Sequence, residues 1–369
     1  MKIAWYLVGT RRTGSSRMEC YHLHDFLTRT DPGSSEVRWS PEEHRATAGL
    51  SPEAELAYLK HAGVDLVVFQ KLSDDISREL ARRCREQGIA TVFVICDYRG
   101  DLTMVPLCTA TIVTSSNLLE LVTSEHPQSD VTFCQYGTEA PPEVTPAFAR
   151  GGNRSTELVY LGSVRLSREF GFLNRIAGTR LTTIGPYEDY DERLNSSFRA
   201  RLRTELAWRA RPARPDVGAL TSLSTRPLPT TRPWHPETVY KDLASCDIGV
   251  IPLEGHQLSS VSGRMKSNSR LLSMWGVGLA TITSPLKSYV ETINHGVDGF
   301  IAASRRDWIR LITLLRRNPE LRVEIARNAR ARAFGEFRLE RQYRAYMAVF
   351  TRAQERAGSS RGAAPGSLD

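Results

Sequence analysis

The sequence DIGVIPL at residues 247–253 is followed by KSNSRLL at 266–272 and by GVGLATITSP at 276–285. The first and third stretches hold short runs of apolar residues that end at a proline, which is typical of strands buried on both faces of a sheet. The second stretch begins with polar residues and continues into apolar ones, as a helix does when it follows a loop. The succession of strand, loop, helix and strand predicts an α/β fold with a parallel sheet.

The first half of the chain repeats this pattern. Apolar runs that predict strands alternate there with amphipathic segments that predict helices. The predicted strands are residues 3–8, 64–69, 90–96, 111–116 and 131–136. Ser16 is expected to cap the helix after the first strand, and a further helix is expected over 74–87. Such a pattern predicts a doubly wound parallel sheet in this half as well.

The whole chain of 369 residues exceeds what one hydrophobic core usually organises. A segment rich in proline and glycine, 137–156, predicts a linker, after which strands are expected at 158–162, 181–185, 247–253 and 279–284. The irregular stretch 186–236 receives no assignment. We therefore expect two Rossmann-like, doubly wound domains that face a cleft, with a ligand at the carboxyl ends of the strands.

Composition narrows the class of protein. With 41% hydrophobic and 24% charged residues, the chain is globular, and it lacks the apolar run of ~18 to 20 residues that a membrane-spanning helix needs. The first residues lack the features of a signal peptide, and the six cysteines form no CxxC pair, so we expect buried thiols and a cytoplasmic location. The net charge is +8, and only six of the 49 lysine and arginine residues are lysines. No nucleic-acid motif accompanies this charge, which leaves attraction to anionic substrates or to an acidic membrane surface.

Two basic residues lie where a phosphate would bind. The amino end of a helix offers unpaired N–H groups and a positive dipole. Lys266 and Arg270 are four residues apart at this expected helix start, so both are predicted to reach the same side of it. They would neutralise a diphosphate leaving group. The alternative is a solvated basic turn.

The same region resembles the carboxyl-terminal domain of GT-B glycosyltransferases, in particular glycosyltransferase family 4 (group 1). About 60 residues, from Asp247 to Ala302, follow the pattern of that family, including the segment His295 to Phe300. The resemblance implies an amino-terminal acceptor domain over 1–145, a nucleotide-sugar domain over 156–335 and a carboxyl-terminal helix, 336–358, that crosses back to the first domain. A flexible tail is expected over 359–369. It further implies transfer from a nucleotide-diphosphate sugar with retention of configuration and no permanently bound cofactor.

Carried over by position, the resemblance implies that Lys266, Ser267 and Asn268 form the loop that receives the donor. Arg270 stands where the family often has a lysine, and the position of Glu291, which follows Tyr289 in the same motif, implies contact with the nucleotide.

The chain also departs from the family pattern. Met265 and Ser273 stand where many members have two glutamates, and Glu254 in the preceding loop is a replacement with the wrong spacing. Ser163 stands at the position of an arginine, with Arg165 close by to replace it.

In the first half, the loop 9–16 brings Gly14 and Ser15 to the end of the first strand. Glycine there lets the backbone approach a ligand, although a plain connection from strand to helix explains it equally well. Asp97 follows the strand 90–96 and points toward the expected cleft, where it would orient an acceptor hydroxyl or cap its own turn. Lys71 reaches the same edge.

Three functions follow from these residues. The first is sugar transfer from a nucleotide sugar to the hydroxyl of a glycan, a lipid or a small natural product, without a metal. A catalytically silent protein that binds a glycan or a partner is the second, because the two glutamates are missing. The third is a GT-B epimerase or phosphorylase. The sequence Asp189-Tyr190-Asp191 predicts a solvated turn rather than a metal site, and the oligomeric state is left open.

Overall fold

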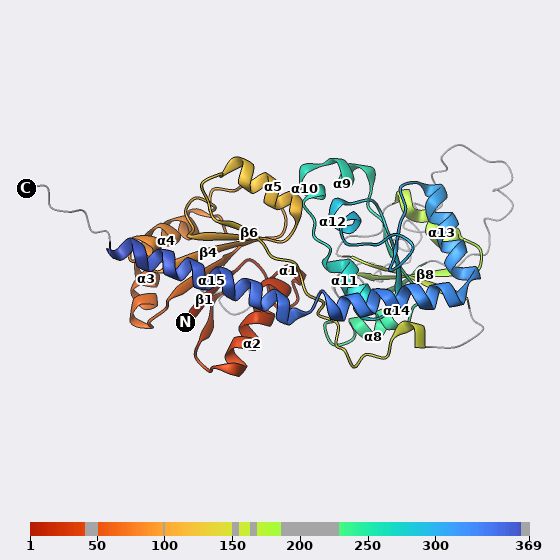
Figure 1. Cartoon of the computed structure of the whole chain (residues 1–369), viewed down its shortest axis with the longest axis horizontal. Helices are drawn as coiled ribbons and strands as arrows, with labels where there is room; N and C mark the ends of the chain where they lie inside the picture. The colour runs from red at the N-terminus through yellow and green to blue at the C-terminus, as the bar shows by residue number, and fades with distance from the viewer. Residues whose placement is uncertain (41–50, 99, 150–154, 163–167, 186–228, 363–369) are drawn as a thin grey trace, which may run out of the picture. The chain divides into compact units, whose positions relative to one another are not determined.

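The computed structural model describes residues 1–40, 51–98, 100–149, 155–162, 168–185 and 229–362. The chain forms two compact units, each built around a parallel six-stranded sheet (Figure 1). The first unit contains Met1–Gly137, Ser259–Asn268 and Phe337–Asp369, and the second contains Thr138–Leu258 and Ser269–Glu336. The prediction of an α/β fold with two doubly wound sheets is confirmed.

The sheet of the first unit has the strand order β2-β1-β3-β4-β5-β6. Its strands are β1 Ile3–Leu7, β2 Ser35–Trp39, β3 Leu66–Gln70, β4 Ala90–Ile95, β5 Ala110–Val113 and β6 Val131–Phe133. After β2 the chain returns to the other side of β1, so the order reverses between β1 and β3. In open α/β sheets, ligands bind outside the carboxyl ends of the strands at this point of reversal.

Short polar side chains start the helices that cover this sheet. The helices of the first unit are α1 Gly14–Ser16, the π-helical turn η1 Arg17–Tyr21, α2 His22–Thr30, α3 Pro52–His61, α4 Asp75–Glu86, α5 Ser116–Glu125, α10 Val261–Arg264 and α15 Leu339–Gly362. Ser51, Asp74 and Ser115 each accept a hydrogen bond from a backbone N–H in the first turn of α3, α4 and α5. Such caps satisfy donors that a helix end leaves unpaired.

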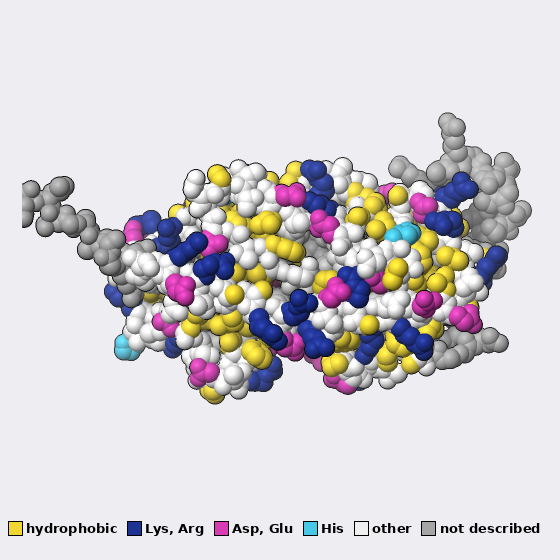
Figure 2. All heavy atoms as spheres, in the orientation of Figure 1, with side chains coloured by type: hydrophobic (Ala, Val, Ile, Leu, Met, Phe, Trp, Pro, Cys, Tyr) yellow, Lys and Arg dark blue, Asp and Glu magenta, His cyan; other side chains and the backbone are white. Residues whose placement is uncertain are grey.

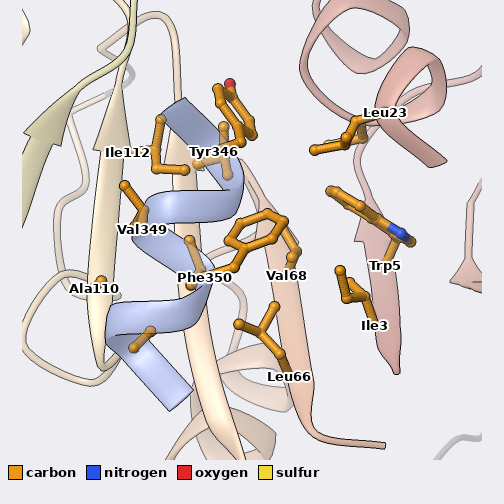
Figure 3. Packing of buried hydrophobic residues seen from close by; sticks show 14 of the residues in the cluster. Ile3, Trp5, Leu23, Leu66, Val68, Ala110, Ile112, Tyr346, Val349 and Phe350 are labelled. Atoms are coloured by element: carbon orange, nitrogen blue, oxygen red, sulfur yellow. The ribbon is translucent and has the colours of Figure 1, made fainter. Parts of the chain in front are cut away.

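The last helix, α15, packs on the first sheet against β4 and β5. Figure 3 shows its side chains Tyr346, Val349 and Phe350 pointing into a cluster of buried residues from the strands. The rings of Phe350 and Trp5 meet edge to face with their centroids 5.9 Å apart. Replacing a buried phenylalanine or tryptophan with alanine typically destabilises a protein by about 3–5 kcal/mol. The contacts of Phe350 therefore make α15 an integral part of this core.

The sheet of the second unit has the order β12-β11-β10-β7-β8-β9. Its strands are β7 Thr156–Leu161, β8 Thr179–Gly185, β9 Thr230–Pro233, β10 Ile248–Ile251, β11 Ala280–Thr283 and β12 Phe300–Ile301. This is the strand order of dinucleotide-binding Rossmann folds, and it reverses between β7 and β10. The helical segments of this unit are η2 Ala147–Ala149, η3 Arg168–Arg175, α8 Val239–Ala244, α9 Gly255–Ser259, α11 Ser269–Gly276, α12 Lys287–Val290, α13 Arg305–Arg317 and α14 Pro319–Gly335.

The described part of the predicted linker, up to Ala149, packs onto the second unit. Thr138 donates a hydrogen bond to the carbonyl of Leu272, and Arg330 donates to the carbonyl of Pro142. A Cβ added to Gly276 would clash with Ala140, which shows how closely the segment approaches α11. The predicted linker is therefore a packed connection here, not a loose one, because the absence of a side chain at Gly276 of α11 lets this segment lie close to the helix.

Arginine and lysine side chains are spread over the face of the protein shown in Figure 2. In Figure 2 they lie among aspartate and glutamate side chains over both units and form no single patch. Within the described residues, no helix is long and apolar enough to cross a membrane.

Candidate functional site

The carboxyl ends of β1, β3 and β4 bring together side chains from three loops. Gly9 follows β1, and a Cβ at this position would lie 2.6 Å from the Thr13 side chain and 2.7 Å from Oγ of Ser16. Glycine thus allows α1 to fold back against the end of the strand and fixes the place of Ser15. Lys71 directly follows β3, and Asp97 lies two residues after β4.

Lys71 connects these loops. Its Nζ atom donates a hydrogen bond to Oγ of Ser15 at 3.0 Å and forms an ion pair with Oδ1 of Asp97 at 2.9 Å. The Lys71 side chain is 6% exposed and the Asp97 side chain 35%. The cation is therefore buried behind a carboxylate that solutes can reach.

A second carboxyl group lies deeper in the unit. Glu19, in η1, is fully buried and accepts hydrogen bonds from the hydroxyl of Tyr136 and from Nε2 of Gln70, the latter at 2.7 Å. Gln70 in turn accepts a hydrogen bond from Oγ of Ser16 at 3.0 Å. These bonds satisfy the buried polar groups, as a low-dielectric interior requires. They also show that Ser16 lies inside α1 and bonds to β3, so its predicted role as a helix cap is wrong.

Burial and charge together set the protonation of this cluster. Burial alone would lower the pKa of Lys71, but the nearby Cys96, Glu19 and Asp97 raise it above its ordinary value, so the ammonium is charged at neutral pH. Burial raises the pKa of the Glu19 carboxyl and outweighs the attraction of the Lys71 cation. Burial and the charge of Glu19 also raise the pKa of Cys96, which keeps this thiol neutral.

The second unit places a cation beside its own point of strand reversal. Arg270 is the second residue of α11, and its guanidinium carbon lies 5.8 Å from the centre of the Tyr160 ring on β7. Burial raises the pKa of Tyr289, against the opposing charge of Arg270, so this phenol remains protonated. The combination of a guanidinium, a helix amino end and a neutral phenol suits an anionic, hydroxyl-bearing ligand.

Residues 171–348 match a protein family described as "Glycosyl transferase-like". The matched segment contains Arg270, Tyr289 and Glu291. No curated protein sequence is similar enough to the chain to match it.

Solved glycosyltransferase structures resemble the chain over nearly its whole length. A glycosyltransferase from Rickettsia africae has a TM-score of 0.65 at 11% identity, and the match covers 95% of this chain and 98% of that one. Sucrose-phosphate synthase from Thermosynechococcus elongatus gives 0.64 at 12% identity, covering 95% and 99%. HepE from Anabaena, in complex with UDP, gives 0.62 at 12% identity, covering 95% and 100%. The chain has the GT-B fold of these structures.

In this GT-B protein, Lys266 and Arg270 do not lie on one helix. The backbone N–H of Lys266 bonds to the carbonyl of Gly263, at the end of α10, while α11 begins only at Ser269. Lys266, Ser267 and Asn268 moreover belong to the first unit. The expected helix start is therefore corrected: α11 begins after Lys266 and contains only Arg270 of the two cations.

The buried side chain of Asn268 holds this segment on the first unit. Its Oδ1 atom accepts a hydrogen bond from Nε2 of Gln135 at 3.0 Å, and Ser115 and Asn117 donate to the backbone carbonyls of Met265 and Arg264. Asn268 is 3% exposed, which favours a packing role over a direct contact with a donor.

The two positions where the family often has glutamates carry other chemistry in the GT-B fold of this chain. Met265 is buried in the hydrophobic core of the first unit. Ser273 is buried in α11, where its hydroxyl donates to the carbonyl of Ser269 at 3.2 Å. Neither provides a charge for a sugar or a ribose.

The remaining predicted residues are only partly described. Glu254 contacts His256 at 2.7 Å, and Glu291 contacts Lys287 at 3.9 Å at the end of α12. Gly14 begins α1 and is exposed. Ser163, Arg165 and Asp189-Tyr190-Asp191 lie outside the described residues. Within the described residues, no three His, Cys, Asp or Glu side chains come together in a group that could hold a metal ion.

The sequence indicates that Lys71 and Asp97 are site residues, but it does not indicate this for Glu19. Lys71 is one of six lysines and directly follows a buried strand, as Asp97 nearly does. Glu19 stands between the apolar residues Met18 and Cys20, and no sequence pattern marks it as a site residue. Its pairing with Tyr136 joins distant parts of the chain and depends on the tertiary structure.

Proposed function

We propose that this chain transfers a sugar, in the first instance a hexose, from a nucleotide-diphosphate sugar to an acceptor hydroxyl. The match of residues 171–348 to a glycosyl transferase-like family carries the proposal. HepE, a structural neighbour, was solved with UDP-glucose. The matched segment of this chain contains β10, one of the two strands at the reversal of the second sheet. UDP-sugars are therefore the first donors to test.

The proposed reaction breaks the bond between the anomeric carbon and the diphosphate oxygen. The acceptor oxygen forms the new bond to that carbon, its proton leaves, and the nucleoside diphosphate departs with the bonding electron pair. Arg270, with its guanidinium beside the amino end of α11, would stabilise the growing charge on the diphosphate. Lys266 is a second candidate for this role, and Glu291 and Tyr289 are candidates for the nucleotide side. Asp97 would receive the acceptor hydroxyl, near Gly14 and Ser15.

Two finer features belong to the proposal. We propose retention of the anomeric configuration, following the resemblance to family 4, and catalysis by positioning and electrostatics without a metal. Proton NMR of the first-formed product reads its configuration directly. Turnover that persists in excess EDTA would support the metal-free reaction, whereas turnover restored only by added Mg²⁺ or Mn²⁺ would reject it.

Donor binding is tested by replacing each cation together with a matched control. Lys266→Ala and Arg270→Ala should each weaken the affinity for the donor while the melting temperature stays near that of the wild type. Lys60→Ala and Arg306→Ala remove exposed cations of the same two units and should leave the affinity unchanged. Unchanged donor affinity and turnover in both Lys266→Ala and Arg270→Ala would reject these roles.

Met265 and Ser273 favour one second candidate, a catalytically silent binding protein. Such a protein would bind a nucleotide sugar or a glycan but release no nucleoside diphosphate from any donor. A thermal-shift screen against UDP-, GDP-, ADP- and dTDP-sugars, followed by an assay of diphosphate release, separates the two functions, because ligand binding alone raises the melting temperature.

A further inference from the structure

Lys71 has a backbone and an environment that packing alone does not explain. Its φ angle is +57°, and no other non-glycine residue in the described ranges has a positive φ. Such a conformation is energetically unfavourable and persists where the surrounding structure demands it. Burying an ammonium group adds a further desolvation penalty. A strand end that needed only an apolar contact would carry neither feature.

The contacts of Lys71 show what this conformation achieves. The left-handed turn after β3 directs the side chain along the carboxyl edge of the sheet, where its Nζ atom meets Ser15 from α1 and Asp97 from the loop after β4. The backbone N–H of Lys71 bonds to the carbonyl of Val94 in β4, which ties its own turn to that strand. One ammonium group thus fixes two polar side chains from separate loops.

The exposure of the three groups runs in one direction. The Lys71 side chain is 6% exposed, Ser15 is half-buried and the Asp97 side chain is 35% exposed, so the carboxylate is the more accessible partner of the ion pair. Behind Lys71 lie Cys96, a neutral thiol, and the buried Glu19. The charges of Lys71 and Asp97 offset each other within one ion pair, so the pair presents hydrogen-bonding atoms without a net charge of its own.

We propose that Lys71 is a positioning residue that holds Asp97 and Ser15 as one unit to receive the attacking hydroxyl of the acceptor. The inference rests on the proposed function, because it concerns the acceptor side of that reaction. Lys71 does not touch the acceptor and moves no proton. It fixes the direction of the Asp97 carboxylate, and misplacement of a reacting group by about 1 Å can cost roughly 100-fold in rate.

Hydrolysis of the donor tests this role, with water in place of the acceptor. The variants are Lys71→Met, which keeps the length of the side chain and removes its charge, Asp97→Asn, and the double variant. Lys71→Met should lower kcat for hydrolysis of UDP-glucose, or of whichever donor the thermal-shift screen selects, by roughly 10- to 100-fold. The KM for the donor and the Kd for UDP should stay within about twofold of the wild-type values, because the change leaves the second unit intact.

The double variant separates positioning from a general structural effect. If Lys71 acts through Asp97, the kcat of the double variant should equal that of the less active single variant. The effects of residues that act as a unit on kcat are not additive. Losses that multiply, or a kcat of Lys71→Met within about twofold of wild type, would overturn the proposal. Lys60→Met is the matched control, an exposed lysine of the same unit.

Two further measurements keep the test decisive. If Lys71→Met does not fold, Ser15→Ala removes one contact without leaving a buried charge and should also lower kcat at unchanged donor KM; an unchanged kcat would overturn the proposal. A wild-type protein that neither binds nor hydrolyses any donor would reject the proposed function instead. A crystal structure of Lys71→Met then tests the positioning alone, and an Asp97 side chain in its original place would overturn it.

Discussion

The Nζ atom of Lys71 lies 2.9 Å from Oδ1 of Asp97, across the carboxyl ends of β3 and β4. This ion pair joins two neighbouring strands beside the point where the order of the first sheet reverses. Open α/β sheets bind ligands at such points, and the pair lies there together with Ser15.

Replacing Glu19 by glutamine should change how stability depends on pH. Burial raises the pKa of Glu19 in the folded protein above the ordinary value of 4.5. Above that value the unfolded chain gives up a proton that the folded protein keeps, so folding loses stability as the pH rises toward the folded-state pKa. Glu19→Gln has no carboxyl group at this position, so its stability does not show this decrease as the pH rises. Its melting temperature relative to wild type should therefore increase as the pH rises above about 4.5.

Glu125→Gln, an exposed residue of the same unit, serves as the control for that experiment. Its melting temperature should differ from that of the wild type by a constant amount over the same pH range. A difference between Glu19→Gln and wild type that is equally independent of pH would show that Glu19 is ionised in the folded state.

Arg270→Met should weaken donor binding through the loss of one charge-assisted contact. Hydrogen bonds to charged groups contribute about 1.5–3 kcal/mol, which corresponds to roughly a 10- to 150-fold increase in Kd. Isothermal titration calorimetry with UDP measures this change, and Arg306→Met on α13 is the matched control. The affinity should also fall with added salt in the wild type and less steeply in Arg270→Met. Equal affinities of wild type and variant would contradict the assignment.

Phe350→Ala should destabilise the first unit by about 3–5 kcal/mol, because a fully buried ring is removed from the contact between α15 and the sheet (Figure 3). Thr351→Ala, next to it on the exposed face of α15, should stay within about 0.5 kcal/mol of wild type. Calorimetric unfolding of the full chain measures both. Equal melting temperatures for the two variants would show that α15 is not part of this core.

Gly276→Ala should destabilise the second unit by roughly 1–3 kcal/mol, since the new methyl group would meet Ala140 and Thr138. Gly335 at the end of α14 is the control, because a Cβ there has no atom within 4 Å. Gly335→Ala should be neutral or stabilise by about 0.4–1 kcal/mol. If both substitutions stabilise the protein, the segment after Gly137 does not pack as described.

The sequence predicted the central strands of both sheets and the edge strand β6, but it missed the edge strands β2, β9 and β12. Strands such as β3 and β4 are continuous apolar runs because both faces are buried, and this pattern is local. The edge strand β2, in contrast, is short and half-exposed and carries Glu36 and Arg38. The strand β12 has two residues, and β9 ends at Pro233, so neither shows a strand pattern.

The candidate site was predictable in the first unit and misjudged in the second. Asp97 and Lys71 follow buried strands, and parallel strands bring their carboxyl ends to one edge. No local signal shows that residues 259–268 leave the second unit, since the contacts of Met265 and Asn268 come from strands and loops more than 100 residues away. The spacing between Lys266 and Arg270 therefore described a helix that begins later than predicted.

The proposed transfer from a nucleotide sugar is tested by one assay with the purified protein. The assay measures the release of nucleoside diphosphate from a panel of UDP-, GDP-, ADP- and dTDP-sugars. We expect at least one donor to raise the melting temperature and to release its nucleoside diphosphate, faster when hydroxyl-bearing acceptors are added. That release should fall sharply in Arg270→Met and remain in Arg306→Met. A folded protein that binds none of these donors and releases no diphosphate from any of them would contradict the account.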